Sequence, residues 1–245
     1  MEKSIYKNIC KAALKGQKLL AVLIDPDKFS VSNTKAFVKK VNQSITTHIF
    51  VGGSTVNAYA TDLLVAEIKK HTQLPVVLFP GGISQITGKA DALLFLSLIS
   101  GRNPDYLIGK HVKAISKLRG LQLQVIPTGY ILIENGKETA VQRVTQTVPM
   151  SRSNLQDIID TAKAGQLLGM KLLYLEAGSG ALQPVTPQII SSVKKELDIP
   201  LIVGGGIRNQ KQLEQAYKSG ADLVVIGTAF EEDESFFKSI AKPLN

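Results

Sequence analysis

Residues 201–228, LIVGGGIRNQKQLEQAYKSGADLVVIGT, constrain the possible folds of this chain more than any other stretch. Two short apolar runs rich in β-branched residues, 201–203 and 223–226, are typical of strands buried on both faces of a parallel sheet. Between them, apolar residues recur at helical spacing over 213–217, and Gly220 can end a helix there. The stretch therefore predicts a strand, a helix and a second parallel strand.

Both of these strands are followed by glycine, three residues at 204–206 and one at Gly227. Because glycine has no side chain, its backbone N–H group can approach an anion closely, and the helix that follows adds its positive N-terminal end. In (β/α)8 barrels a phosphate commonly sits at the loops after the seventh and eighth strands. The pattern favours a barrel that binds a phosphate-bearing ligand, and it leaves open glycines that serve only to make tight turns.

The chain length agrees with one such barrel, because 245 residues is close to the roughly 250 that this fold typically needs. We therefore expect residues 1–245 to form a single domain. Cys10 is the only cysteine, so the chain cannot form an internal disulfide, and an intracellular protein is expected. The N-terminus lacks the apolar core of a signal peptide, and the apolar runs are too short to span a bilayer. We expect a cytoplasmic protein.

The net charge is +9, from 29 Lys and Arg against 20 Asp and Glu. This excess favours anionic partners such as phosphorylated metabolites or acidic lipid surfaces. The lysines are scattered, and no dense basic run or RNA-binding aromatic motif is present. No nucleic-acid partner is expected.

The rest of the chain repeats the alternation of strand and helix. We expect six further strands, at 19–24, 48–51, 76–79, 92–98, 124–126 and 172–176. We expect further helices at 3–15, 32–41, 56–70, 105–118, 154–168, 187–197 and 234–240. After the strand at 124–126, Asn135 and Gly136 predict a hairpin that lies above the barrel.

One helix is missing from this series, between the third and fourth strands. The segment PGGI…ADALLFLSL resembles GGGI…ADLVVIGTA, which indicates two similar half-barrels. Seven positions separate Ile83 from Ala90, whereas fourteen separate Ile207 from Ala221, a difference of about two helical turns. A barrel without this helix exposes an apolar groove, which usually binds something. The alternative is that a loop or a partner subunit covers the gap.

Polar residues at the predicted C-terminal strand ends indicate a site, since barrel active sites are built on that face. They are Asp25, Ser54, Thr128, Glu176, Ser179 and Thr228. Any one of them could be a helix cap or a turn residue, but six on one rim are not explained by capping alone. Asp25 and Ser54 offer hard oxygen ligands from neighbouring strands, a set that suits Mg²⁺ held mainly by a substrate's phosphates and by water.

Glu176 is a candidate general base. It ends the predicted strand at 172–176 and precedes a Gly-Ser-Gly turn, so its carboxylate could accept a hydroxyl proton beside a bound phosphate. The alternative is an ion pair with a nearby lysine. His48, His71 and His111 are dispersed along the sequence and indicate no zinc site, so we interpret them as structural.

Eight motifs together resemble the geranylgeranylglyceryl phosphate synthase family, which includes the bacterial heptaprenylglyceryl phosphate synthases. They are LIDPDK at 23–28, VGGS at 51–54, FPG at 79–81, NPDYLIG at 103–109, PTGYIL at 127–132, YLEAGSGA at 174–181, VGGGIR at 203–208 and GTAFE at 227–231. The resemblance covers nearly the whole chain, and its long, glycine-rich form is similar to the archaeal-type branch. It implies a modified (β/α)8 TIM barrel that lacks helix 3, the helix after the third strand.

The resemblance also implies an activity and a site. The activity is Mg²⁺-dependent transfer of a polyprenyl group, here geranylgeranyl, from its diphosphate to the 3-hydroxyl of sn-glycerol 1-phosphate, with release of diphosphate. Asp25 and Ser54 would bind Mg²⁺, with Asp25 and Glu176 as the catalytic residues. The residues around the glycerol phosphate would be Tyr174, Leu175, Glu176, Ala177, Gly178, Ser179, Gly180, Gly205, Gly206, Gly227 and Thr228.

The isoprenoid tail is expected in the groove left by helix 3, beside Tyr106. Lys28 and Arg208 are further candidates for phosphate counter-charges. Because the product is a lipid, the basic surface is expected to dock transiently on acidic head groups. Members of the family are generally homo-oligomers, dimers or assemblies of dimers.

Two other functions remain open at this stage. Another phosphate-binding barrel, such as an isomerase of amino-acid biosynthesis, would use the same glycine turns, but it would usually need a second carboxylate and a complete ring of helices. A non-catalytic barrel that binds phosphorylated ligands or acidic membranes would explain the charge and the glycines, but it would leave Asp25 and Glu176 without a purpose.

Overall fold

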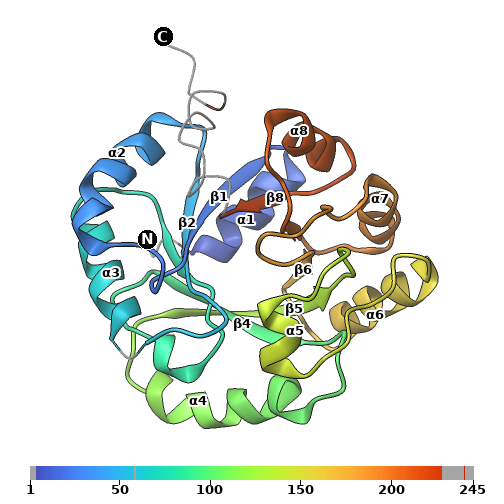
Figure 1. Ribbon diagram of the computed structural model, residues 1–245, viewed down its shortest axis with the longest axis horizontal. Helices are drawn as coiled ribbons and strands as arrows, with labels where there is room; N and C mark the ends of the chain where they lie inside the picture. Colours follow the sequence, from blue (N-terminus) through green and yellow to red (C-terminus); the bar gives the residue numbers. More distant parts are fainter. Residues whose placement is uncertain (1–3, 58, 228–239, 241–245) are drawn as a thin grey trace.

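Eight parallel strands form a closed barrel in the order in which they occur along the chain (Figure 1). The computed structural model describes residues 4–57, 59–227 and 240. Each strand pairs with the next, and the last pairs with the first. The strands are β1 (Leu19–Ile24), β2 (His48–Val51), β3 (Val76–Leu78), β4 (Ala92–Leu98), β5 (Gln124–Leu132), β6 (Leu172–Glu176), β7 (Leu201–Gly204) and β8 (Leu223–Ile226). The (β/α)8 architecture predicted from the sequence is confirmed.

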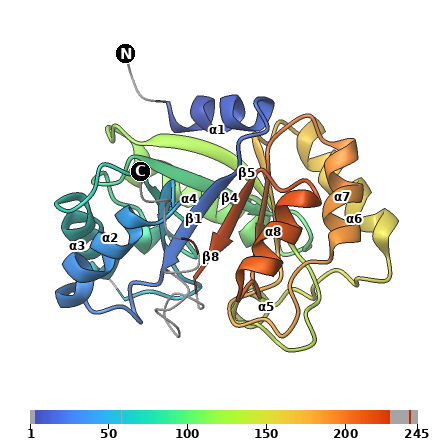
Figure 2. The ribbon, with the colours of Figure 1, turned by 90° about the horizontal axis from the view of Figure 1, so that it is seen from above.

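Within the described residues, six α-helices surround the barrel (Figure 1). They are α2 (Thr34–Gln43), α3 (Ala60–Lys69), α4 (Lys110–Leu118), α6 (Leu155–Leu167), α7 (Pro187–Glu196) and α8 (Gln210–Lys218). Helix α1 (Ile5–Leu14) covers the end where the strands begin, and the short α5 (Ala140–Thr145) lies at the opposite end (Figure 2). The carboxyl ends of the strands therefore form the accessible face.

Side chains of the strands alternate between two packed layers. In β1, Leu20 and Val22 pack toward the surrounding helices, whereas Ala21 points into the barrel interior. Phe50 and Tyr174 are among the largest fully buried side chains, and both belong to the interior layer. Because side chains fill the interior, the barrel is a packed core and a ligand must bind at the rim or on the side.

The connection between β3 and β4 contains no α-helix, as the residue spacing predicted. Within the described residues it holds only the 3-10 turn η2 (Ile83–Gln85). Three glycines and a proline occupy positions 80–88, so the segment has neither the length nor the composition of a helix. The outer ring is open between α3, which follows β2, and α4 (Figure 1).

Two predictions about the fifth strand are wrong. We expected the strand to end before Pro127, but β5 continues to Leu132. Proline lacks only the amide hydrogen, and the Pro127 carbonyl still accepts a hydrogen bond of 2.8 Å from the Lys171 amide, so pairing continues. The predicted hairpin about Asn135 is absent, because Ile133 instead forms a parallel bridge with Met150 and the chain then enters α5.

The longer strand also moves Thr128 away from the rim. Thr128 lies in the middle of β5, is fully buried and donates a hydrogen bond of 2.9 Å to the carbonyl of Ile126. Its assignment to the rim was wrong.

Other boundaries differ from the predictions by a few residues. Helix α3 begins at Ala60 rather than near 56, and a short π-helix, η3 (Asp105–Gly109), precedes α4 within the helix expected at 105–118. The helix expected at 234–240 lies outside the described residues except for Ile240. In the part of the chain that the structure describes, no helix combines the length and apolar character needed to cross a membrane.

Candidate active site

Two adjacent cavities open at the carboxyl ends of the strands. The first, which we call the rim cavity, has a volume of about 250 Å³ and is bordered by the residues that follow β1, β2, β6, β7 and β8. The second, the side groove, has a volume of about 130 Å³ and lies where the helix after β3 is missing. The residues that line both are Gly53, Ser54, Phe79, Tyr130 and Val141. The two cavities are therefore neighbours that share one wall.

Glu176 is a buried carboxylate in the rim cavity. It is 5% exposed at the end of β6, and its Oε1 atom accepts a hydrogen bond from the Gly178 amide. Burial raises the pKa of Glu176 from 4.5 to about 6, and the neighbouring Tyr174 hydroxyl and the Gly178 amide limit this rise. Among the described residues, no Lys or Arg forms an ion pair with it. The geometry fits a general base better than a structural ion pair.

The glycine turns after β6 and β7 meet beside this carboxylate. Gly205 has φ +84°, and a Cβ atom there would collide with the Glu176 carboxylate and with the Gly178 backbone. Only glycine allows the loop after β7 to approach so closely. Gly178 and Gly180 also have positive φ, of +100° and +65°. Backbone groups of the turns after β6 and β7 therefore lie close together beside the Glu176 carboxylate.

Asp25 and Ser54 line the same cavity from the ends of β1 and β2. The side chain of Asp25 is 20% exposed, and its Oδ2 atom lies 3.6 Å from the Lys28 ammonium. One carboxylate beside one hydroxyl fits Mg²⁺ that receives its other ligands from substrate phosphates and water. Among the described residues, no group of three His, Cys, Asp or Glu side chains could hold a metal without such help.

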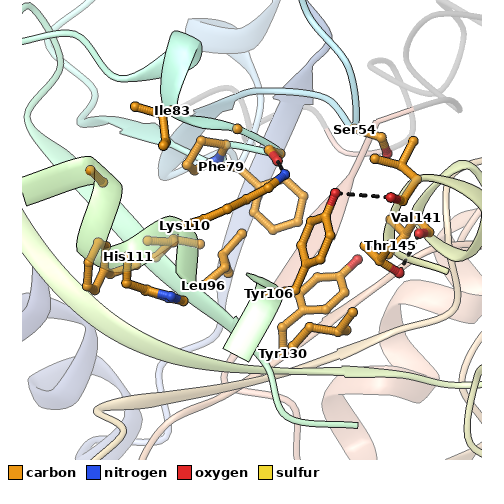
Figure 3. A pocket seen from close by; sticks show the side chains of 18 of the residues that line it. Ser54, Phe79, Ile83, Leu96, Tyr106, Lys110, His111, Tyr130, Val141 and Thr145 are labelled. Carbon is orange, nitrogen blue, oxygen red and sulfur yellow. Dashed lines mark hydrogen bonds between the residues drawn. The ribbon is translucent and has the colours of Figure 1, made fainter. Parts of the chain in front are cut away.

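The side groove is mainly apolar and is bordered by β3, β4, η3, α4 and α5 (Figure 3). The Tyr106 hydroxyl donates a hydrogen bond of 3.1 Å to the Val144 carbonyl, which links η3 to α5 across the groove. The Lys110 ammonium lies 3.9 Å from the centre of the Tyr106 ring and donates to the Gly81 carbonyl at 3.2 Å. The expected groove therefore exists, and Tyr106 lines it as predicted.

The structure brings most of the predicted site residues together. Those that line the rim cavity are Asp25, Ser54, Tyr174, Glu176, Ser179, Gly180, Gly205, Gly206 and Gly227. Leu175 and Ala177 instead direct their side chains into the outer core, so only their backbone groups are available to a ligand. Thr228 lies outside the described residues.

Arg208 also lines the rim cavity, and its guanidinium donates a hydrogen bond of 3.3 Å to the Ala181 carbonyl.

The three histidines lie on different elements of the fold. Burial lowers the pKa of His48 to about 4, His71 contacts Glu67, and His111 packs against Phe95 and borders the side groove. His111 therefore lies at the edge of the candidate site, although we expected a structural residue.

Sequence reasoning missed three polar residues at this site: Gln85, Lys110 and Lys137. The Lys137 ammonium lies 3.3 Å from the position that a Cβ atom on Gly180 would occupy. Asn135 holds this segment in place, because its side-chain amide donates to the Ala177 carbonyl and accepts a 3.2 Å bond from the Lys137 amide. The Asn135-Gly136 pair indicated a turn at this position. Because we interpreted it as the turn of a hairpin above the barrel, we did not consider Lys137, the next residue, as a site residue.

The fold and the site define a (β/α)8 barrel with a carboxylate-bearing rim cavity and an apolar side groove in place of one helix. The PcrB family model matches residues 14–244, and the chain belongs to this family. Proteins named geranylgeranylglyceryl phosphate synthase are similar to it. The one from Flavobacterium johnsoniae is 55% identical over 96% of this chain and 97% of its own length. The one from Zunongwangia profunda is 56% identical over 94% and 98%.

A solved structure shows the same fold. The crystal structure of (S)-3-O-geranylgeranylglyceryl phosphate synthase from Thermoplasma acidophilum, in complex with its substrate sn-glycerol-1-phosphate, has a TM-score of 0.90 and 33% sequence identity. The match covers 97% of this chain and 95% of that protein.

Proposed function

We propose that this protein is a Mg²⁺-dependent prenyltransferase. It would join the 3-hydroxyl of sn-glycerol 1-phosphate to a polyprenyl group, geranylgeranyl in the first instance, and release diphosphate. The observation that carries the proposal is the meeting of two unlike cavities: one with charged residues, among them buried Glu176, and a more apolar one beside it. The names of the relatives and the ligand of the Thermoplasma structure support it.

The rim cavity would hold the glycerol phosphate. Backbone N–H groups of the glycine turns, together with Arg208 and Lys137, supply positive potential for the phosphate. Fixing this substrate removes much of the entropic barrier to a reaction between two molecules. Glu176, with a pKa of about 6, is mostly ionised at neutral pH and would take the proton of the attacking hydroxyl.

The side groove would hold the isoprenoid tail. Each buried CH₂ group contributes about 0.8 kcal/mol, so a long tail can be held by apolar contact alone. The reacting carbon would lie at the junction, where the rings of Phe79, Tyr130 and Tyr174 meet with centroids 5.3 to 6.0 Å apart. Aromatic faces attract cations, so these rings would favour positive charge on an allylic carbon as its bond to diphosphate breaks.

Asp25 and Ser54 would hold the Mg²⁺ ion. When bound, the ion would neutralise the charge that builds on the departing diphosphate. Lys110, at the end of the side groove near Ser54, is placed to add a second positive charge. Lys28, 3.6 Å from Asp25, is a further cation at this end of the rim.

We also propose transient contact with acidic membrane surfaces and a homo-oligomeric state. The net charge of +9 and a lipid substrate support the first. Apolar side chains exposed on the outer side of α4 and η3, Ile108, Val112 and Ile115, offer a surface for either contact.

The transferase proposal is tested by incubating the protein with radiolabelled sn-glycerol 1-phosphate, Mg²⁺ and a panel of prenyl diphosphates. Transfer of label into an organic phase is expected, and the chain length of the product identifies the preferred donor. If the label binds but stays in the aqueous phase with every donor, the barrel is a phospholigand-binding protein. A labelled, water-soluble product formed without a donor would indicate an isomerase.

A further inference from the structure

Gln85 is a buried side-chain amide that binds both backbone polar groups of one residue, Gly53. Its Nε2 atom donates to the Gly53 carbonyl at 2.8 Å, and its Oε1 atom accepts from the Gly53 amide at 3.2 Å. The side chain is 2% exposed. Because the peptide N–H can only donate and the carbonyl can only accept, these two bonds also determine the orientation of the amide.

The same glycine touches the candidate metal ligand on its other side. A Cβ atom on Gly53 would lie 2.8 Å from Oδ1 of Asp25, so the backbone there is in direct contact with the carboxylate. Ser54 is the next residue. Gln85 and Asp25 thus both lie next to Gly53, the residue that precedes Ser54.

The segment that carries Gln85 is itself held from the opposite side. The Lys117 ammonium donates to the carbonyls of Ile83 and Ser84, each at 3.2 Å, and the Gly81 amide donates to the Gly53 carbonyl at 3.2 Å. The turn that replaces the missing helix is thus hydrogen-bonded both to α4 and to the loop after β2.

A neutral amide is well suited to this position. A lysine or arginine next to the Gly53 loop would add positive charge close to Asp25 and would compete with a metal cation for the carboxylate. An aliphatic side chain would remove the partner of the Gly53 amide and leave the Gly53 carbonyl with the bond from the Gly81 amide alone. Glutamine satisfies both backbone groups and adds no further positive charge to that of Lys28, which lies 3.6 Å from Asp25.

We propose that Gln85 is a positioning residue of the metal site, which holds Ser54 against Asp25 so that both can ligate Mg²⁺. This role rests on the proposed function, since it assumes the Mg²⁺ requirement. Gln85 does not touch the reacting atoms. It acts through the Gly53 peptide, in the way that outer contacts of a metal site orient its ligands.

The test compares Gln85→Met with the wild type in two measurements. The first is the Mg²⁺ concentration that gives half the maximal transfer rate at saturating organic substrates. We expect it to rise at least about tenfold, the lower range for loss of an orienting contact, with the KM for glycerol 1-phosphate changed less than about twofold. The second is the increase in melting temperature that Mg²⁺ with inorganic diphosphate produces, which we expect to be lost or much reduced.

Gln124→Met is the matched control. Gln124 also uses both ends of its amide, accepting from the Tyr6 amide and donating to the Ser4 hydroxyl, but at the α1 end of the barrel. This variant should lose stability without any change in Mg²⁺ dependence. If Gln85→Met does not fold, Gln85→Asn, which keeps a shorter amide, should show the same change in smaller degree.

The outcomes separate this inference from the proposed function. A folded Gln85 variant whose Mg²⁺ dependence and Mg²⁺-induced melting shift match the wild type overturns the positioning role alone. A wild-type protein that shows the melting shift, sensitive to Gln85, but transfers no prenyl group overturns the transferase and leaves the role intact. A wild-type protein that responds to Mg²⁺ in neither measurement overturns both the metal site and the role of Gln85.

Discussion

The Glu176 carboxylate accepts a hydrogen bond from the Gly178 amide, in the same turn that places Gly180 in the wall of the rim cavity. The proposed base and the proposed phosphate site are thus parts of one local structure. A bound phosphate would therefore lie within a few residues of the group that removes the proton.

The raised pKa of Glu176 predicts the pH dependence of transfer. Since the base must be ionised, kcat/KM should fall about tenfold for each pH unit below about 6 and level off above it. Glu176→Gln should reduce transfer at pH 7.5 at least ~10²-fold. A rate in the wild type that is constant from pH 5 to 7.5 would contradict the role of Glu176 as the base.

The same shift predicts an effect on stability. Because the folded-state pKa lies above the unfolded value, the buried charge destabilises the protein above pH 6, and this penalty disappears as the pH falls below 4.5. Glu176→Gln should therefore raise the free energy of unfolding by up to about 2 kcal/mol at pH 7.5, at 1.36 kcal/mol per pKa unit, and have little effect at pH 4.5. Denaturant titrations at the two pH values measure the difference.

Asp25→Asn should keep the fold and reduce transfer at least ~10²-fold at ordinary Mg²⁺ concentrations, because the amide is a much weaker metal ligand than the carboxylate. Asp27→Asn is the control. Asp27 lines the same cavity, but its carboxylate is occupied by the Asn57 amide at 3.0 Å. Equal losses in the two variants would argue against a specific metal site at Asp25.

A large side chain in the side groove should shorten the accepted isoprenoid. Leu96 lines the groove from β4, so Leu96→Trp is expected to shift the preferred donor from a C20 diphosphate to shorter ones, with the KM for glycerol phosphate unchanged. Leu167→Trp, at the exposed end of α6, should leave the product profile as in the wild type. An unchanged profile in the Leu96 variant would place the tail elsewhere.

Two glycine substitutions separate backbone strain from damage to the site. Gly205 and Gly16 both have positive φ, so alanine should destabilise the protein by roughly 1–2 kcal/mol at Gly16, and by more at Gly205, where the Cβ atom also meets the Gly178 backbone. Only at Gly205 would the new Cβ atom strike Glu176; Gly16 has nothing within 4 Å. Gly205→Ala should therefore lose transfer activity as well as stability, whereas Gly16→Ala should lose stability alone.

Lys137→Met should weaken binding of glycerol phosphate. Removal of one charge beside the Gly180 loop is expected to raise the KM for this substrate about tenfold, as for a lost charge-assisted hydrogen bond of about 1.5–3 kcal/mol, with a smaller change in kcat. The KM for the prenyl diphosphate serves as the internal control. A parallel rise in both KM values would show a general loss of positive potential instead.

Several features of the fold were readable from local sequence. Five of the eight strands, β1, β2, β4, β6 and β8, have the boundaries that their apolar runs predicted, because burial on both faces demands unbroken apolar residues. The missing helix followed from counting residues between Ile83 and Ala90. Asp25, Ser54 and Glu176 were found because residues that end neighbouring parallel strands must meet at one rim.

What the sequence alone determined is thus the repeating barrel unit, the position of its gap and the residues at the strand ends, since each depends on a local pattern. The tertiary structure decided that β5 runs through Pro127, that Thr128 is buried and that Lys137 lies beside Gly180. It also decided that Gln85 forms hydrogen bonds with both backbone groups of Gly53. These contacts join segments far apart in the chain or depend on which way a strand turns its side chains, and no local pattern contains that information.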